Sequence, residues 1–343
     1  MRNVRAAGRL LAAAEVVAFY LAVGPVLALL PASVAYRVAC WRGDLMFRTW
    51  SGKRGEVLRG LRLVLGDELG PAEIRRVARD VFRIRSCEII DLMRLRGRAR
   101  ALGRLVDIRG REHLEAALAQ GKGAILCGAH YGSYLAVHSL LQEAGFPLTT
   151  MGRWWWRYPP GQTSASGRVW DFIYARRVLR HRQRPNIEPW PGRVQVAVQA
   201  AAALRDNEVV TIASDAPPLE AERTRAIAVP FLGHQATMIP GIVPLAQLTG
   251  APVLMATAYR TADYRHQVLE ISAPVPMDGG TATAFGRCTT AMETAIREHP
   301  AEWDFWFEPG DLVRLGLVPG DPGPVSAPGP VASPVAGPGA MTA

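Results

Sequence analysis

The spacing of apolar residues in this chain changes near residue 105. Before that point, apolar positions such as Ile74, Val77, Val81 and Ile84 recur at intervals of three and four residues. This spacing is typical of an amphipathic helix, and the opposite face here carries mostly arginine. We therefore expect helical structure over residues 1–50, 54–70 and 71–100.

Beyond residue 105, short apolar runs alternate with longer amphipathic stretches. We expect strands over residues 105–108, 124–127, 147–151, 209–213, 253–259 and 267–271. We expect helices over residues 112–120, 133–144, 193–205, 239–248 and 284–299. This alternation predicts an α/β fold with a mixed, largely parallel sheet flanked by helices.

The chain divides into three parts by composition. Residues 51–314 have the balance of a packed α/β domain, whereas residues 315–343 are rich in Pro, Gly and Ala and are expected to be disordered. In the first part, 1–50, residues 16–30 are almost continuously apolar, but Gly24 and Pro25 interrupt a run shorter than the ~20 residues of a span. We interpret this part as a helical, membrane-associating segment, with a buried core helix or a signal peptide as alternatives.

The formal net charge is +10, and nearly all the cations are arginine, because lysine occurs only at positions 53 and 122. Guanidinium groups suit phosphates and anionic lipid headgroups, although a general bias toward arginine codons explains the excess equally well. The four cysteines lack metal-ligand spacing, so we expect no metal site and no bound cofactor. No nucleic-acid-binding motif accompanies the charge, and we expect no nucleic-acid partner.

His130 follows the apolar run 124–127 within small, turn-prone residues, which places an imidazole at the end of a buried strand. Such a histidine can act as a general base, because its ordinary pKa lies near physiological pH. Asp215 follows the strand 209–213 in the same way, so neighbouring strands would bring both side chains to one edge of the sheet. Backbone N–H groups at Gly132 and Ser133 would then lie at a helix start, where they can hold an oxyanion. The alternatives are a buried structural histidine and an Asx turn at Asp215.

Five stretches occur in a fixed order along the chain: residues 109–114, 123–132, 212–215, 229–237 and 298–303. In these stretches the chain resembles the lipid A biosynthesis acyltransferase family, which includes lauroyl and myristoyl transferases and the related phosphatidylinositol mannoside acyltransferases. The resemblance implies that residues 51–314 form an acyltransferase domain and that His130 activates the acceptor for attack on an acyl thioester. In this family the histidine opens a His-x4-acid motif, but Leu135 stands at the acid position here. Asp215 is the best substitute, as in the mannoside acyltransferases.

The resemblance also implies partners and further contacts. The donor would be acyl-CoA or an acyl carrier protein, and the acceptor a lipid or a small molecule with a hydroxyl or amine. Arg153 matches a basic residue that the family places near the active site, and Arg176 and Arg177 begin a basic patch suited to donor phosphates or headgroups. All three are equally compatible with plain surface arginines. We expect the protein at the cytoplasmic face of the plasma membrane, against its anionic surface.

Two alternatives remain for the function. One is an enzyme of a specialised pathway that joins a carrier-bound acyl or aminoacyl unit to a small acceptor. The other, favoured by Leu135, is a catalytically silent protein that binds lipid or a carrier protein.

Overall fold

A computed structural model describes residue 14 and residues 18–133, 140–152, 187 and 195–321. Its helices are η1 (Phe19–Val23), α2 (Gly24–Leu29), α3 (Ala32–Thr49), α4 (Ser51–Leu65), α5 (Pro71–Gly103), α6 (Arg111–Leu118), α9 (Gln195–Arg205), η4 (Glu220–Arg225), α10 (Ile242–Thr249), α11 (Thr281–Glu298), η5 (Pro300–Glu302), η6 (Asp304–Phe307) and α12 (Pro309–Leu315). Its strands are β1 (Val106–Arg109), β2 (Ala124–Gly128), β3 (Leu148–Met151), β4 (Val209–Ala213), β5 (Ile227–Phe231), β6 (His234–Met238), β7 (Val253–Arg260) and β8 (Gln267–Ile271).

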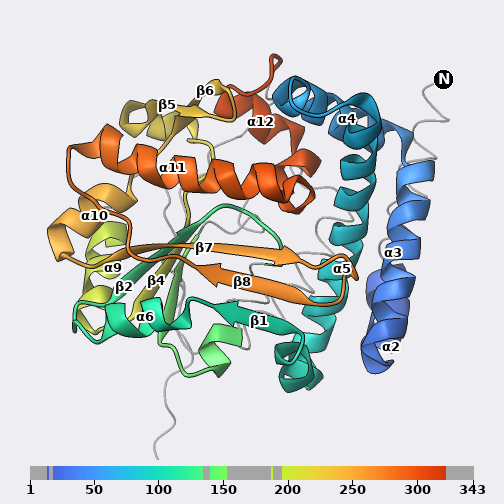
Figure 1. The fold of residues 1–343 in the computed structure, drawn as a ribbon, viewed down its shortest axis with the longest axis horizontal. Coiled ribbons are helices and arrows are strands. Elements are labelled where there is room, and N and C mark those ends of the chain that lie inside the picture. The colour runs from blue at the N-terminus through green and yellow to red at the C-terminus, as the bar shows by residue number, and fades with distance from the viewer. Residues whose placement is uncertain (1–13, 15–17, 134–139, 153–186, 188–194, 322–343) are drawn as a thin grey trace, which may run out of the picture.

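Six of these strands form one sheet in the order β1-β8-β7-β2-β4-β3 (Figure 1). All neighbours are parallel except β7 and β8, which are antiparallel because a tight hairpin joins them. The expected α/β class with a mixed, largely parallel sheet is thus confirmed.

Both faces of the sheet are covered, as expected for a largely parallel sheet. Along β2 the side chains alternate: Ile125 and Cys127 join a core with α9, α10 and α11, whereas Ala124 and Leu126 join a second core with α6. All four residues are fully buried or nearly so. The strand β2 is therefore buried on both faces at the centre of the fold, and this packing fixes the position of its carboxyl end.

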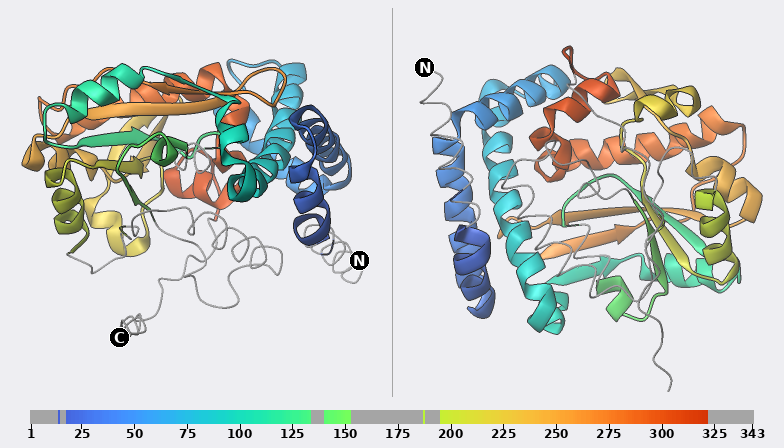
Figure 2. Two further views of the ribbon diagram at one scale, coloured as in Figure 1. Left: turned by 90° about the horizontal axis from the view of Figure 1, so that it is seen from below. Right: turned by 180° about the vertical axis from the view of Figure 1, so that it is seen from behind.

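The N-terminal helices form a separate layer. The long helix α5 stands beside the sheet, and α3 packs along its outer side (Figures 1 and 2). A third core fills the space between α2, α3 and α5 and includes Tyr36, Cys87 and Ile90. In the described part of the chain, every helix is too short or too polar to cross a bilayer. Membrane association of residues 1–50 stays a prediction.

Three differences from the sequence-based expectations have local causes. The antiparallel pair β5–β6 was not predicted, because Pro230 lies within β5 and the run is short. Half of the helix expected over residues 133–144, residues 134–139, lies outside the described residues; residues 140–143 are helical and Ser133 is not. The helix expected to begin at residue 239 begins at Ile242, after Pro240 and Gly241.

Candidate active site

Parallel pairing of β2 with β4 places two strand ends side by side. Gly128 is paired with Ala213, and the N–H of Ser214 donates to the carbonyl of Gly128 at 2.9 Å. His130 and Asp215 each lie two residues beyond this last pair. Their meeting follows from the register, although 85 positions separate them in the sequence.

The ring of His130 and the carboxylate of Asp215 are in direct contact. His130 Nδ1 lies 2.7 Å from Asp215 Oδ1, and the backbone N–H of His130 donates to Oδ2 at 2.9 Å. The Asp215 side chain is fully buried, whereas 27% of the His130 side chain is exposed. One buried carboxylate therefore holds both the loop and the ring, and the Nε2 edge of the ring is turned away from it.

A C-terminal segment completes the surroundings of the pair. The indole N–H of Trp303 donates to Asp215 Oδ2 at 2.9 Å, and the ring of Phe305 stacks on the His130 ring at a centroid distance of 5.0 Å. The N–H of Asp304 donates to the carbonyl of His130 at 2.9 Å, beside a bridge between Tyr131 and Trp303. The Asp215 carboxylate thus accepts from three directions, which fixes its orientation.

The electrostatic surroundings favour a protonated imidazole. Burial by itself lowers the pKa of His130, but the negative charge of Asp215 and its hydrogen bond to Nδ1 outweigh burial. Asp304 and Asp311 add to the effect, and the net pKa lies above its ordinary value. The ring can therefore accept a proton and hold the resulting charge against Asp215.

Gly132 and Ser133 lie at the back of this loop. The N–H of Gly132 donates to the carbonyl of Glu302 at 2.9 Å, so this amide is already engaged in the loop. Gly132 adopts a left-handed backbone (φ 57°) directly against the carbonyl of Ala258, where any side chain would collide. The Ser133 side chain is buried in a polar network. The Gly132 N–H is thus already used by Glu302, and an oxyanion contact at the Ser133 N–H stays a prediction.

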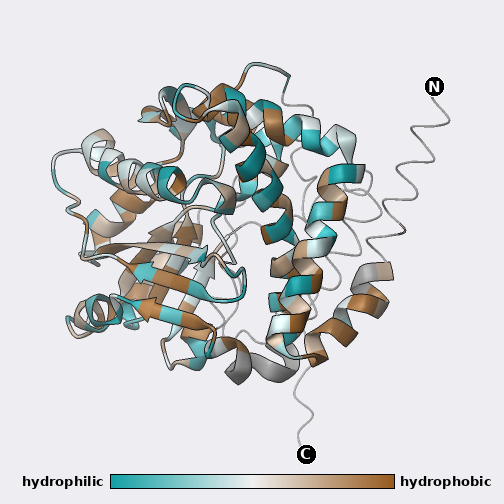
Figure 3. Ribbon diagram, turned by 45° about the vertical axis from the view of Figure 1, so that its right-hand side comes forward, coloured by the Kyte–Doolittle hydropathy of each residue, from teal (hydrophilic) through white to brown (hydrophobic). Residues whose placement is uncertain are grey.

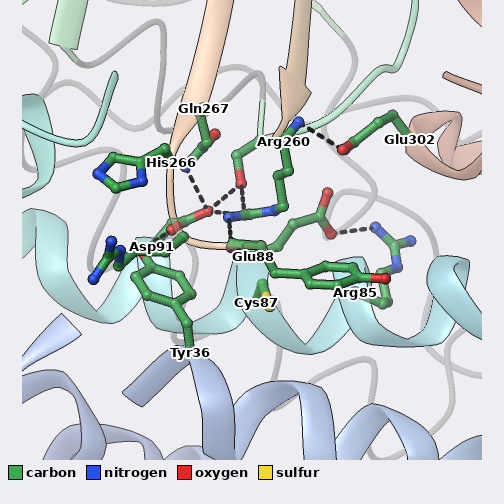
Figure 4. A network of polar contacts seen from close by, with 12 residues as sticks. Tyr36, Arg85, Cys87, Glu88, Asp91, Arg260, His266, Gln267 and Glu302 are labelled. Atoms are coloured by element: carbon green, nitrogen blue, oxygen red, sulfur yellow. Dashed lines mark hydrogen bonds and ion pairs between the residues drawn. The ribbon is translucent and has the colours of Figure 1, made fainter. Parts of the chain in front are cut away.

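That polar network centres on Asp91 of α5 (Figure 4). Its carboxylate accepts hydrogen bonds from Tyr36, Ser133, Arg260 and Gln267, and it forms a buried ion pair with Arg260. The guanidinium of Arg260 also donates to the Ser133 hydroxyl at 2.9 Å. The network ties α3, α5, the His130 loop and β7 together from inside.

Two buried glutamates extend this polar interior. Glu302 accepts the backbone N–H of Arg260 at 2.7 Å, and burial raises the pKa of Glu302 to about 7 although the charge of Arg260 opposes the shift. Arg85 bridges Glu88 at 3.2 Å and Asp304 at 2.8 Å. Burial, and then the charge of Asp304, raise the pKa of Glu88 to about 8. Residues 302–304, which pair with the His130 loop, are therefore held by polar contacts with Arg260 and Arg85.

Sequence reasoning missed the Asp91 network altogether. Its signal was an acid in the apolar stretch Ile89-Ile90-Asp91-Leu92-Met93, where a carboxylate needs a buried partner. Glu302 and Trp303 were noted only for the family pattern that they complete, without a role. No sequence spacing links either of them to Asp215 or Arg260.

Other expected site residues lie outside the described residues: Arg153, Arg176, Arg177 and the position of the missing acid, Leu135. Across the described ranges, no group of three or more His, Cys, Asp or Glu side chains is arranged to hold a metal ion.

The fold and the site together define an α/β protein with a histidine–carboxylate pair at the carboxyl edge of a largely parallel sheet. The sequence model of the bacterial lipid A biosynthesis acyltransferases matches residues 7–157 and 172–310, most of the chain. The protein therefore belongs to this family and is an acyltransferase of lipid biosynthesis. Among curated proteins, no sequence matches it.

Proposed function

We propose that this protein transfers an acyl group from a coenzyme A or carrier-protein thioester to a hydroxyl or amine of a glycolipid-like or lysolipid-like acceptor. His130 is the general base, and Asp215 orients it. The observation that carries the proposal is the 2.7 Å contact between His130 Nδ1 and Asp215 Oδ1. It supplies the carboxylate partner that Leu135 does not.

The proposed step balances without a cofactor. His130 Nε2 takes the proton of the acceptor hydroxyl as the oxygen attacks the thioester carbonyl. The tetrahedral intermediate then collapses, the carbon–sulfur bond breaks, and the imidazolium returns its proton to the departing thiolate. Asp215 accepts the hydrogen bond from Nδ1–H throughout and stabilises the transient positive charge on the ring.

The charge of the chain supports either donor. A net charge of +10 suits the phosphates of coenzyme A and the acidic surface of a carrier protein alike. Arg153, Arg176 and Arg177 are proposed contacts of these anions.

We also propose that the protein acts at the cytoplasmic face of the plasma membrane. Large apolar side chains are exposed along η1, α2 and α3, among them Leu21, Val26, Leu29 and Trp41. In Figure 3 the helix α2 is largely hydrophobic, and its neighbouring helices carry both hydrophobic and hydrophilic residues. An exposed apolar strip on short helices fits an interfacial position.

The experiment is acyl transfer with purified protein, radiolabelled acyl-CoA or acyl carrier protein, and lipid or small acceptors. We expect turnover in the wild type and its loss in His130→Gln. The matched control is His234→Gln, a change at a half-buried histidine of β6, in the two-stranded sheet. Equal turnover in both variants would refute His130 as the base. No turnover in the wild type, with lipid binding retained, would support a silent binder, and transfer only to a small soluble acceptor would support the specialised-pathway enzyme.

A further inference from the structure

Helices α3, α4 and α5 enclose a hollow of about 410 Å³ on the side of the molecule that carries the exposed apolar helices. Six arginines line it: Arg48, Arg54, Arg75, Arg76, Arg79 and Arg83. The lining contains one carboxylate, that of Asp80. This concentration of guanidinium groups is far above the average of the chain.

Half of these arginines are neutralised by neighbours. Asp44 of α3 accepts bidentate hydrogen bonds from both Arg79 and Arg83, and Glu73 pairs with Arg76 at 2.9 Å. Asp80 adds weaker pairs at 3.4 and 4.0 Å.

The other half, Arg48, Arg54 and Arg75, form no ion pair within the described residues. Three guanidinium groups of the hollow therefore have no carboxylate partner among the described residues.

Two of the uncompensated groups are held in place. The guanidiniums of Arg54 and Arg75 lie over the ring of Phe47, at 5.7 and 5.5 Å from its centroid. Arg54 also donates to the carbonyls of Phe47 and Arg48 at 2.8 and 2.9 Å, at the end of α3. Preorganised guanidinium forks of this kind match the oxygens of a phosphate.

We propose that this hollow binds the phosphate of an anionic phospholipid headgroup. On α3, Val34, Trp41 and Leu45 are exposed and fall, together with Arg48, within a sector of about 60° at 100° per residue. The apolar strip of α3 thus leads along one face to the hollow. A helix seated with this strip in the bilayer brings Arg48, in its last turn, to the depth of the headgroups.

The hollow is separate from the acyl-transfer site. The buried ring of Phe82 contacts Phe47 of the hollow at a centroid distance of 5.5 Å and Phe307 at 4.9 Å. Phe307 belongs to η6, the helix that also carries Phe305 of the acyl-transfer site. A phosphate bound by these arginines would therefore anchor the protein at the membrane and take no part in acyl transfer. The inference rests on the membrane position proposed above and adds a phosphate-specific site to it.

The experiment measures binding of the full chain to vesicles of phosphatidylcholine containing phosphatidylglycerol. Arg48→Gln/Arg75→Gln is compared with Arg205→Gln/Arg225→Gln, a pair of exposed arginines in α9 and η4 with the same loss of charge. Since a basic residue near an anionic surface contributes about fivefold, we expect binding to weaken about thirtyfold in the first pair and little in the second. Circular dichroism checks the fold of each variant.

Two further measurements distinguish specific binding of a lipid phosphate from diffuse attraction to a charged surface and from binding of soluble coenzyme A. On vesicles whose negative charge comes from fatty-acid carboxylates, we expect the first pair to lose less than on phosphatidylglycerol. Equal losses on both vesicles, or in both pairs, would overturn the phosphate site in favour of diffuse attraction. Loss of soluble coenzyme A binding in the first pair, with vesicle binding intact, would also overturn it.

The membrane position is tested independently with Trp41→Ser/Leu45→Ser, which should weaken binding to every vesicle, including uncharged ones. A wild type that binds no vesicle would overturn both the position and the phosphate site. His130→Gln should bind vesicles as the wild type does, so a failure of the acyl-transfer proposal is distinguishable from a failure of this one.

Discussion

Two buried aspartates hold opposite ends of the same short loop. Asp215 contacts His130 at one end, and Asp91 contacts Ser133 at the other. Both carboxylates are inaccessible to solvent, and both accept several hydrogen bonds. They differ in the exposure of their charged or titratable partners. Asp215 pairs with the partly exposed ring of His130, whereas Asp91 pairs with the guanidinium of Arg260, whose side chain is 1% exposed.

This difference in exposure assigns Asp215 to the candidate active site and gives Asp91 a structural role. A buried carboxylate paired with a buried arginine has no proton to exchange with a substrate, and its contribution is to the position of the loop. A buried carboxylate paired with a partly exposed imidazole can support proton transfer at the surface. The same residue type thus serves chemistry or stability according to the exposure of its partner.

The largest effect on catalysis is expected for Asp215→Asn, which tests whether Asp215 supports proton transfer at His130. The amide cannot stabilise an imidazolium and favours the wrong ring tautomer, so we expect turnover to fall on the order of 10³-fold or more. Acyl transfer under single-turnover conditions measures the effect. Asp206→Asn, an exposed aspartate after α9, is the control and should keep wild-type turnover. Full activity in Asp215→Asn would remove this carboxylate from the mechanism.

The opposite result is expected at the second carboxylate. Asp91→Asn leaves the Arg260 charge buried without its partner, which should lower the free energy of unfolding by about 3–5 kcal/mol. Denaturant unfolding measures the loss. The double change Asp91→Asn/Arg260→Met should lose less than the single change, because it removes the orphaned charge as well. If Asp91→Asn lowered the free energy of unfolding no more than Asp206→Asn does, the structural role of Asp91 would be contradicted.

The smallest expected effect is on the pH profile of acyl transfer. A general base must be neutral, so kcat/KM should rise with pH through the pKa of His130, above the ordinary value of about 6.5. In Asp215→Asn, burial remains and lowers the pKa, while the charge and hydrogen bond that raise it are lost. The acid limb of the residual activity should therefore move to lower pH. An unmoved limb would show that another group titrates there.

The pairing of His130 with Asp215 was predictable from the sequence, because each follows a short apolar run and parallel strands end at one edge of a sheet. The Asp91 network was not. Nothing local indicates that Asp91 of α5 meets Arg260 at the end of β7, since the contact depends on how α5 packs beside the sheet. The same holds for Trp303, whose indole reaches Asp215 only because residues 302–304 pair with the His130 loop.

The amino-acid sequence alone is enough to predict the periodicity of the elements, the α/β class, the turn that carries the histidine and the resemblance to a family of acyltransferases. These are consequences of spacing within a few residues, where backbone geometry sets the period. The packing of the folded chain sets which buried carboxylate meets a partly exposed ring and which meets a buried arginine. It also sets which arginines of α3, α4 and α5 converge on one hollow. Exposure and convergence arise from packing between distant segments, and no local pattern encodes them.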